Sequence, residues 1–305
     1  MKQPKLIAIT GPSASGKTKL AIETAKELNG EIISVDSRQI YKELNIGSAK
    51  PSIEEQESIV HHLLDIVSIK DEFTAADFCD IAKQKIDEII SKGKVPVLAG
   101  GTGLYFRILL QDFDLPRVAP DKKLREKLEQ KTSEELYSML KDYDKVSAEK
   151  IHFNNKVKII RALEVCFTLN IPMSQAQKKK ENPYCVDWYG LNSENRDFLY
   201  NRINLRCEKM IENGLIEEVK HLFDKYGENN ILLNTIGYQE FYPYLKGEID
   251  INEAVEILKQ NTRRYAKRQI SWFKANKDIH WFDIEHTEIE KIKDYITNHY
   301  YLDKL

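Results

Sequence analysis

The 305-residue sequence contains only four cysteines, Cys79, Cys166, Cys185 and Cys207, which lie far apart and form no CxxC pair. This spacing argues against a zinc site and against a disulfide framework. Long apolar runs are missing too: none approaches the roughly 20 residues that a membrane-spanning helix needs, and the N-terminal apolar stretch is too short for a secretory signal. We therefore expect a cytoplasmic protein with reduced thiols and no membrane contact.

Neither sign of charge dominates the chain, because 46 lysines and arginines are set against 48 aspartates and glutamates, for a net charge of −2. Affinity for a nucleic acid would therefore have to come from local clusters of basic residues. The overall charge neither supports nor excludes an RNA substrate. The hydrophobic content of 42% is enough for the core of one large α/β unit with a smaller appended part.

Short apolar strands alternate with amphipathic helices over the first third of the chain. The pattern predicts strands at 5–10, 31–35 and 94–99, and helices at 17–29 and 75–92. Alternation of this kind is typical of right-handed βαβ units on a parallel sheet. Ligands of such sheets bind at the carboxyl ends of the strands.

The pattern changes between about 120 and 182, where charged helical segments contain no convincing strand and prolines mark both limits. This predicts a helical insertion at 120–182 in an α/β core made of 1–119 and 183–305. In the second part of the core we expect a strand at 186–191 and helices at 196–212, 214–226 and 252–273. A helix-like tail follows after about residue 283.

A glycine-bounded turn between the first strand and the first helix fits the pattern GxxxxGK[ST]. Glycines let such a loop curl so that backbone N–H groups and the helix N-terminus point at one anion, while the lysine adds positive charge and the last hydroxyl can bind Mg²⁺. We therefore predict a phosphate or diphosphate cradle on a P-loop NTPase-like parallel sheet. Its residues are Gly11, Pro12, Ser13, Ala14, Ser15, Gly16, Lys17 and Thr18, with Thr18 as the metal ligand.

Asp36 follows the second predicted strand, so we expect its carboxylate at the carboxyl end of a strand close to the P-loop. A carboxylate there can accept a proton from an attacking group, or it could cap a turn together with Ser37. The third strand leads into Gly100-Gly101-Thr102-Gly103 without the acid that holds magnesium in many nucleotide hydrolases. Motor and switch ATPases are therefore disfavoured.

Several longer motifs follow one another in a fixed order. They read Asp36-Ser-Arg-Gln-Ile-Tyr41, Asn45-Ile-Gly-Ser-Ala-Lys-Pro51, His61-His62-Leu-Leu-Asp65, Thr74-Ala-Ala-Asp-Phe78, Gly100-Gly-Thr-Gly-Leu-Tyr105, Arg161-Ala-Leu-Glu-Val165, Gly237-Tyr238 and Thr262-Arg-Arg-Tyr-Ala-Lys-Arg-Gln-Ile-Ser-Trp-Phe273. Each motif alone is weak, but in this order and spacing the chain resembles the tRNA dimethylallyltransferase family from about residue 5 to residue 282.

The resemblance implies transfer of the dimethylallyl group from dimethylallyl diphosphate to the N6 amine of the adenosine immediately 3′ of the anticodon in tRNA. It implies that the P-loop holds the diphosphate, with Mg²⁺ as the cofactor. Asp36 would engage the adenine amine beside Thr102, and Arg206 would contact the diphosphate. These three are the expected catalytic residues.

The resemblance also implies that the helical insertion and the basic C-terminal helix grip the anticodon stem-loop, and we expect a monomer. The stretch from Thr262 to Phe273 interleaves basic residues with aromatic rings, as phosphate contacts beside stacking or packing rings require. Trp272 fits either use. The expected tRNA-binding residues are Asp36, Ser37, Arg38, Gln39, Thr102, Arg125, Arg161, Lys267 and Arg268.

The sequence departs from the family pattern in places. Val157 and Lys158 stand before Arg161 where the family has glutamine and arginine, so the detail of one tRNA contact stays open. His61 and His62 fit either substrate contacts or ordinary loop ends. Without a further ligand at a suitable spacing they predict no metal site.

Three other functions remain open on the residues. A small-molecule or nucleotide kinase would use the same loop, acid position and magnesium, and an adenylate prenyltransferase would share the prenyl donor. An RNA-binding module with a degenerate nucleotide site is the non-enzymatic alternative, and the intact P-loop disfavours it. Arg202 and Arg206 could also form a solvated basic helix face.

Overall fold

A computed structural model describes residues 3–111, 116–176 and 182–302 of the chain. Its contacts divide the chain into two compact units, one made of Met1–Leu110 with Pro183–Leu305 and the other of Gln111–Asn182. The sequence predicts that the insertion starts at 120, whereas the contacts start the second unit at 111. The first unit therefore ends with helix α3 (Gly103–Leu110).

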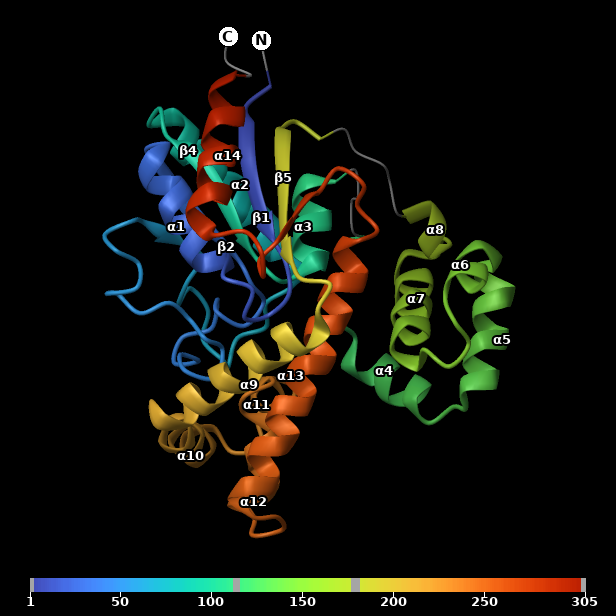
Figure 1. Cartoon of the computed structure of the whole chain (residues 1–305). Coiled ribbons are helices and arrows are strands. Elements are labelled where there is room, and N and C mark those ends of the chain that lie inside the picture. The colour runs from blue at the N-terminus through green and yellow to red at the C-terminus, as the bar shows by residue number, and fades with distance from the viewer. Residues whose placement is uncertain (1–2, 112–115, 177–181, 303–305) are drawn as a thin grey trace. The chain divides into compact units, whose positions relative to one another are not determined.

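The first unit is built on a parallel sheet of six strands in the order β3-β2-β4-β1-β5-β6 (Figure 1). The strands are β1 (Lys5–Thr10), β2 (Gly30–Val35), β3 (His61–His62), β4 (Val95–Gly100), β5 (Cys185–Asn192) and β6 (His280–Asp283). The four strands predicted from the sequence are confirmed, and so is the parallel α/β core. The sequence does not predict β3 and β6, because two and four residues are too few to show a period.

The helices of the first unit connect these strands and continue after them. They are α1 (Lys17–Glu27), α2 (Ala75–Ser91), α3 (Gly103–Leu110), α9 (Arg196–Glu212), α10 (Leu215–Tyr226), α11 (Asn230–Leu233), α12 (Tyr242–Leu245), α13 (Ile251–Phe273) and α14 (Ile289–Leu302), with a 3₁₀ turn at Gln239–Phe241. The five predicted helices are confirmed to within two residues at each end. No helix among the described residues combines the length and the apolar character that a membrane span needs.

Helices cover both faces of the sheet (Figure 1). On one face, Leu20 of α1 and Ile296 of α14 belong to the same buried cluster as alternate residues of β1 and β5. On the other face, the ring of Phe106 in α3 lies 5.5 Å from that of Trp188 and 5.8 Å from that of Phe273 in α13, centroid to centroid. A sheet buried on both faces explains why its strands read as continuous apolar runs.

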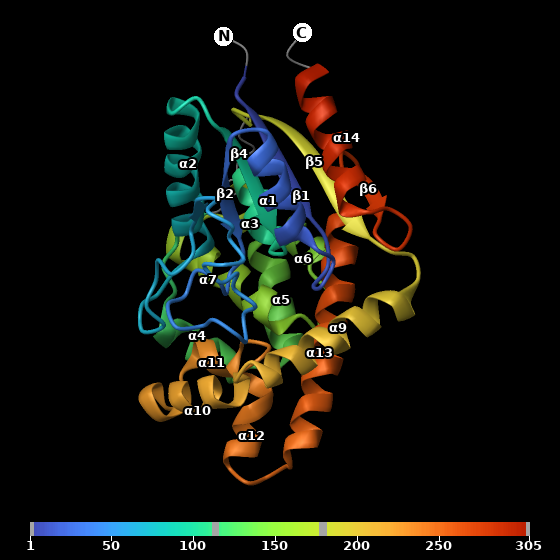
Figure 2. The same ribbon diagram turned by 60° about the vertical axis from the view of Figure 1, so that its left-hand side comes forward.

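A second apolar cluster lies beyond the carboxyl ends of the strands, where α9, α10 and α13 gather (Figure 2). Ile203 of α9, Leu258 of α13 and Tyr238 are buried there against Ile40, which follows β2. This cluster holds α9 and α13 beside the end of the sheet at which a parallel sheet binds its ligands.

The second unit consists of helices α4 (Lys122–Glu129), α5 (Ser133–Tyr143), α6 (Lys145–Lys150), α7 (Lys156–Leu169) and α8 (Met173–Ala176). Leu136 and Leu140 of α5 pack on Ile159 and Leu163 of α7 in its core. The spacing of these residues is the helical period that the sequence shows. No strand interrupts the described part of the unit.

A buried carboxylate ties the start of this unit to α7. Glu164 accepts hydrogen bonds from Arg125 Nε and Nη2, each at 2.8 Å, and from the backbone N–H of Asp121 at 2.7 Å. Arg161, one turn earlier on α7, pairs with the same carboxylate. Two half-exposed guanidinium groups thus neutralise a charge that water does not reach.

Candidate active site

The P-loop joins β1 to α1 and needs glycine at its two ends. Gly11 has a φ of +146°, and a Cβ there would stand 2.4 Å from the carbonyl oxygen of Leu191. Gly16 has a φ of +95° at the N-cap of α1. Both positions exclude ordinary side chains, so the loop curls as the sequence pattern predicts.

Lys17 folds back over this loop. Its ammonium group donates to the carbonyl oxygen of Pro12 at 2.6 Å and to the hydroxyl of Ser15 at 3.5 Å. Arg202 of α9 approaches from the other side, where its Nε donates to the carbonyl oxygen of Ala14 at 2.8 Å. Arg202 is exposed, as the solvated-face interpretation expects, but its guanidinium also contacts the P-loop directly.

Lys17 and Arg206 lie in one electrostatic neighbourhood. Burial, followed by the positive charge of Arg206, lowers the pKa of Lys17 to about 7, while Asp36 opposes that shift. Burial also lowers the pKa of Arg206, and Asp36 again opposes the shift. In the part of the chain that the structure describes, neither cation forms an ion pair with a carboxylate. Two neighbouring cations that pair directly with no carboxylate among the described residues favour the binding of an anion.

Asp36 follows β2 directly, as the sequence predicts. Its Oδ1 accepts the backbone N–H of Arg38 at 2.8 Å and, more weakly, that of Gln39 at 3.4 Å. Within the described residues its Oδ2 accepts no hydrogen bond. One oxygen therefore caps the turn while the other stays available for a ligand, so the two interpretations of Asp36 are compatible.

Thr102 holds the turn after β4 against the turn after β2. Its backbone N–H donates to the carbonyl oxygen of Val35 at 3.2 Å, and its hydroxyl oxygen accepts the N–H of Ser37 at 3.0 Å. Tyr265 of α13 lies beside Thr102, and burial, followed by the charge of Asp36, raises the pKa of Tyr265 to about 12. Thr102 is thus a neighbour of the Asp36 turn, where the sequence expects it.

The side chain of Gln39 is occupied inside the protein. Its Oε1 accepts the hydroxyl of Ser34 at 3.0 Å, and its Nε2 donates to the carbonyl oxygen of Ala49 at 2.9 Å. The neighbouring Arg38 is half-buried and donates to the carbonyl oxygen of Asn234 at 3.2 Å. Gln39 therefore shapes the loop after Asp36, and its contact with tRNA stays a prediction.

Glu218 of α10 anchors the next part of this loop. Its carboxylate accepts the backbone N–H groups of Ile46 at 3.0 Å and Gly47 at 3.1 Å, together with the hydroxyl of Tyr238 at 2.7 Å. A Cβ at Gly47 would stand 2.5 Å from the ring of Tyr238. Two sequence motifs that lie far apart in the chain are therefore in direct contact.

The sequence analysis missed Gln269, which lies in α13 and is only 5% exposed. Its amide hydrogen-bonds to Ser13 of the P-loop and to the carbonyl oxygen of Gly101. The helical spacing of Gln269 from Tyr265 and Trp272 indicates a packed stripe, but it does not indicate which loop the glutamine contacts. Contact with the P-loop appears only in three dimensions.

The basic residues of α13 divide between exposed and packed positions. Lys267 and Arg268 are exposed, and the guanidinium of Arg268 lies 5.6 Å from the centroid of the Tyr265 ring. Trp272 is 41% exposed, yet a Cβ at Gly103 would stand 2.1 Å from its ring. One edge of Trp272 therefore packs on the start of α3 and the remainder faces solvent.

Arg125 and Arg161 keep about a third of their side chains exposed although both pair with Glu164. Their role as tRNA contacts stays a prediction. His62 has a structural role, since its Nε2 lies 2.7 Å from Oε2 of buried Glu31 at the start of β2. His61 pairs through Nδ1 with the carbonyl oxygen of Ile59 at 2.9 Å.

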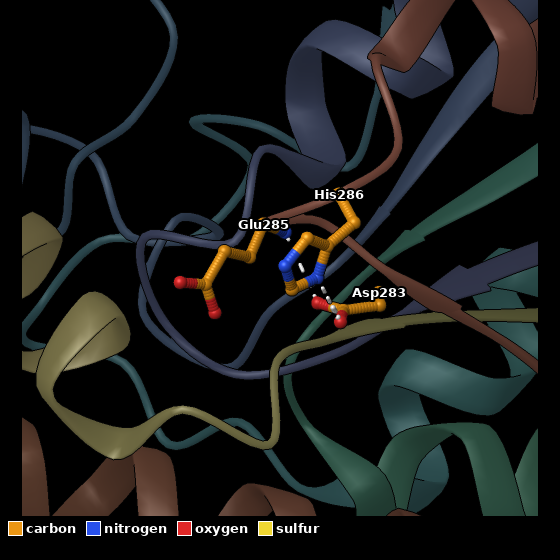
Figure 3. Close-up of side chains that lie close together, drawn as sticks. All are labelled: Asp283, Glu285 and His286. Atoms are coloured by element: carbon orange, nitrogen blue, oxygen red, sulfur yellow. Dashed lines mark hydrogen bonds and ion pairs between the residues drawn. The ribbon is translucent and has the colours of Figure 1, made fainter.

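Thr18 is exposed in the first turn of α1, next to Lys17. A threonine hydroxyl can give Mg²⁺ one oxygen ligand, and this ion usually takes the rest from phosphates and water, so the metal role of Thr18 stays a prediction. A separate cluster of side chains that could bind a metal ion lies at the end of β6 and consists of Asp283, Glu285 and His286 (Figure 3). Its bonds close the turn: His286 pairs with Asp283 at 2.8 Å, and Glu285 accepts hydrogen bonds from two side chains near the end of β5.

The fold and the site together are typical of a P-loop group-transfer protein, since the glycine-bounded loop and the Asp36 carboxylate both lie at the carboxyl ends of parallel strands. The IPP transferase family matches residues 39–276, and the chain belongs to that family.

Its relatives agree over nearly the whole chain. The tRNA dimethylallyltransferase of Acetivibrio thermocellus is 45% identical over 303 residues, which are 95% of this chain and 97% of the relative. That of Gloeothece citriformis is 46% identical over 283 residues, 93% of this chain and 92% of the relative.

Solved structures give the same result. The tRNA delta(2)-isopentenylpyrophosphate transferase of Staphylococcus epidermidis superposes with a TM-score of 0.73 at 37% identity, and the match covers 99% of this chain and 100% of that one. A eukaryotic dimethylallyltransferase acting on tRNA gives a TM-score of 0.83 at 27% identity, over 97% of this chain and 80% of that one.

Proposed function

We propose that the protein transfers the dimethylallyl group of dimethylallyl diphosphate to the N6 amine of the adenosine immediately 3′ of the anticodon in tRNA. The observation that carries the proposal is the Asp36 carboxylate at the carboxyl end of β2, whose charge acts on two cations, Lys17 and Arg206. The carboxylate keeps one oxygen without a partner among the described residues. A diphosphate would neutralise the cations, and an amine would fill the free acceptor.

The leaving group is the diphosphate. When the allylic C–O bond breaks, positive charge develops on the prenyl carbon and the diphosphate takes the electron pair. Stabilising the leaving anion is then expected to be the largest catalytic effect. The amides of the P-loop, Lys17 and Arg206 would supply it, and Arg202 would hold the loop in shape through Ala14.

The acceptor is the exocyclic amine. As its nitrogen bonds to the prenyl carbon, the amine must lose a proton, and Asp36 Oδ2 would receive it. Oδ1 stays bonded to the backbone N–H of Arg38, which keeps the carboxylate oriented. Since a stacked base cannot reach such a site, the adenosine would be extruded from the anticodon loop.

Mg²⁺ would bind at Thr18, with the diphosphate as its other main ligand. When bound, the ion would neutralise part of the charge of the leaving diphosphate. The donor set fits this role, since the hydroxyl of Thr18 stands in the first turn of α1. ATP need not bind at this loop for the transfer to proceed.

The anticodon stem-loop would bind to exposed basic groups. On α13 these are Lys267 and Arg268, and in the second unit Arg125 and Arg161 keep exposed edges beside Glu164. Ser37, Arg38 and Gln39 would line the approach to Asp36. We propose that the protein acts as a monomer, and tRNA as a substrate fits action in the cytoplasm.

A transfer assay tests the proposal. Labelled dimethylallyl diphosphate, unmodified tRNA and Mg²⁺ should give labelled RNA, whereas free adenylate should stay unlabelled. Turnover of ATP in place of prenyl transfer would point to a kinase, and labelled adenylate would point to an adenylate prenyltransferase.

A further inference from the structure

Gln269 of α13 hydrogen-bonds to two loops of the site, the P-loop and the turn that follows β4. Its Oε1 accepts the backbone N–H of Ser13 at 2.8 Å and the hydroxyl of Ser13 at 3.2 Å. Its Nε2 donates to the carbonyl oxygen of Gly101 at 3.0 Å. The side chain is 5% exposed, so these bonds are sheltered from water and are costly to lose.

The two loops that Gln269 joins serve different substrates in the proposed reaction. Ser13 belongs to the P-loop, which would hold the prenyl diphosphate. Gly101 precedes Thr102, whose hydroxyl accepts the N–H of Ser37, the residue after Asp36. A short path of covalent and hydrogen bonds thus runs from the donor loop through Gln269 to the carboxylate that would meet the acceptor.

The contact admits few other residues. A Cβ at Gly101 would stand 2.1 Å from Nε2 of Gln269, so a glycine is needed for the glutamine to fit. An amide offers one acceptor and one donor at the same end of a side chain. Leucine offers neither, and an ionised glutamate would turn an acceptor toward the carbonyl oxygen of Gly101.

We propose that Gln269 is a positioning residue for the transfer reaction, which fixes the P-loop and the Gly101–Thr102 turn at the separation that in-line attack requires. The inference rests on the proposed function. Because the hydrogen bonds of Gln269 are to the two loops, its loss would misalign the two reactants while leaving each binding surface in place. A misplacement of about 1 Å costs roughly 10²-fold in rate.

The test compares Gln269→Leu with Gln260→Leu, the same change at an exposed position of α13. Gln269→Leu should lower kcat by about 10²-fold, while KM for dimethylallyl diphosphate and KM for tRNA stay near the wild-type values. Gln260→Leu should match the wild type throughout. Thermal unfolding followed by circular dichroism shows whether each variant is folded.

Gln269→Glu supplies a second readout that holds even if the leucine variant unfolds. A neutral carboxyl group can accept from Ser13 and donate to Gly101, whereas the ionised form cannot donate. The kcat of this variant relative to wild type should therefore fall as the pH rises, with no matching loss of folded protein.

The inference is overturned if folded Gln269→Leu keeps kcat within about twofold of wild type, far from the loss expected of misalignment. It is also overturned if only the KM values rise, or if the glutamate variant shows a constant ratio across pH. A wild-type protein that fails to prenylate tRNA would instead overturn the proposed function, so the two failures are distinguishable.

Discussion

At the scale of single residues, the proposed reaction gives Asp36 a chemical task in addition to the structural task that its carboxylate has in the turn. Oδ1 caps the turn through the N–H of Arg38, and Oδ2 is left for the substrate. Asparagine can keep the first task because its amide oxygen accepts the same N–H. It cannot take a proton as a carboxylate does, so the two tasks are separable by mutation.

We predict that Asp36→Asn lowers the rate of prenyl transfer by about 10²–10⁴-fold, the usual contribution of a general base. The free energy of unfolding should change little. Single-turnover transfer and thermal unfolding measure the two quantities. A variant that transfers at the wild-type rate would remove Asp36 from the chemistry.

Lys17 gives a prediction about pH. Burial and Arg206 lower its pKa to about 7 in the free protein, so above that pH the amine is largely neutral. A bound diphosphate favours the charged form and raises this pKa. Binding should therefore take up a proton above about pH 7, and the contribution of Lys17 to affinity should fall as the pH rises.

Isothermal titration calorimetry in buffers with different heats of ionisation counts this proton. The experiment uses pyrophosphate or dimethylallyl diphosphate as the titrant. Lys17→Met, which cannot titrate, should show less uptake than the wild type. Equal uptake by both proteins would show that another group binds the proton.

At the scale of elements, separate pieces of chain are joined by polar side chains that are buried or half-buried. Glu218 joins α10 to the 45–51 loop, Gln269 joins α13 to the P-loop, and Glu164 joins α7 to the start of α4. In each case one side chain satisfies donors or acceptors that burial would otherwise leave unpaired.

Glu164 allows a test of this principle within the second unit. Glu164→Ala leaves Arg125, Arg161 and the N–H of Asp121 without their acceptor and should cost about 1–3 kcal/mol. Urea unfolding of the full chain measures the loss. Glu126→Ala, an exposed residue of α4, should have almost no effect.

The same carboxylate also predicts an acid dependence. Burial raises the pKa of Glu164, but the bonds from Arg125 and Arg161 outweigh it, so the folded pKa lies below the usual 4.5. Its contribution to stability is thus present above about pH 4.5 and is lost as the pH falls through the folded pKa. If Glu164→Ala lost as much stability as the wild type when the pH falls through this range, the assignment would be contradicted.

At the scale of the whole molecule, the sequence predicts the elements whose apolar pattern repeats over many residues or whose ends carry a clear residue signal. The sequence predicts the strands β1, β2, β4 and β5 and the helices α2, α9 and α13 because their apolar residues form extended patterns. The P-loop is predicted because its glycines have one geometric purpose. The strands β3 and β6 are too short to leave such a signal.

The site divides in the same way. Asp36 and Lys17 are predictable because each sits next to a strand or helix end in a recognisable pattern. Arg202, Gln269 and Glu218 are not, since their partners lie in distant parts of the sequence. Long-range contacts of single polar side chains depend on the tertiary fold, which local periodicity does not report.

The measurement that tests the account most directly is mass spectrometry of fragments of unmodified tRNA after incubation with the purified protein, dimethylallyl diphosphate and Mg²⁺. We predict one dimethylallyl group on the adenosine immediately 3′ of the anticodon with the wild type, and almost none with Asp36→Asn. Unmodified tRNA together with phosphoryl transfer from ATP would contradict the account.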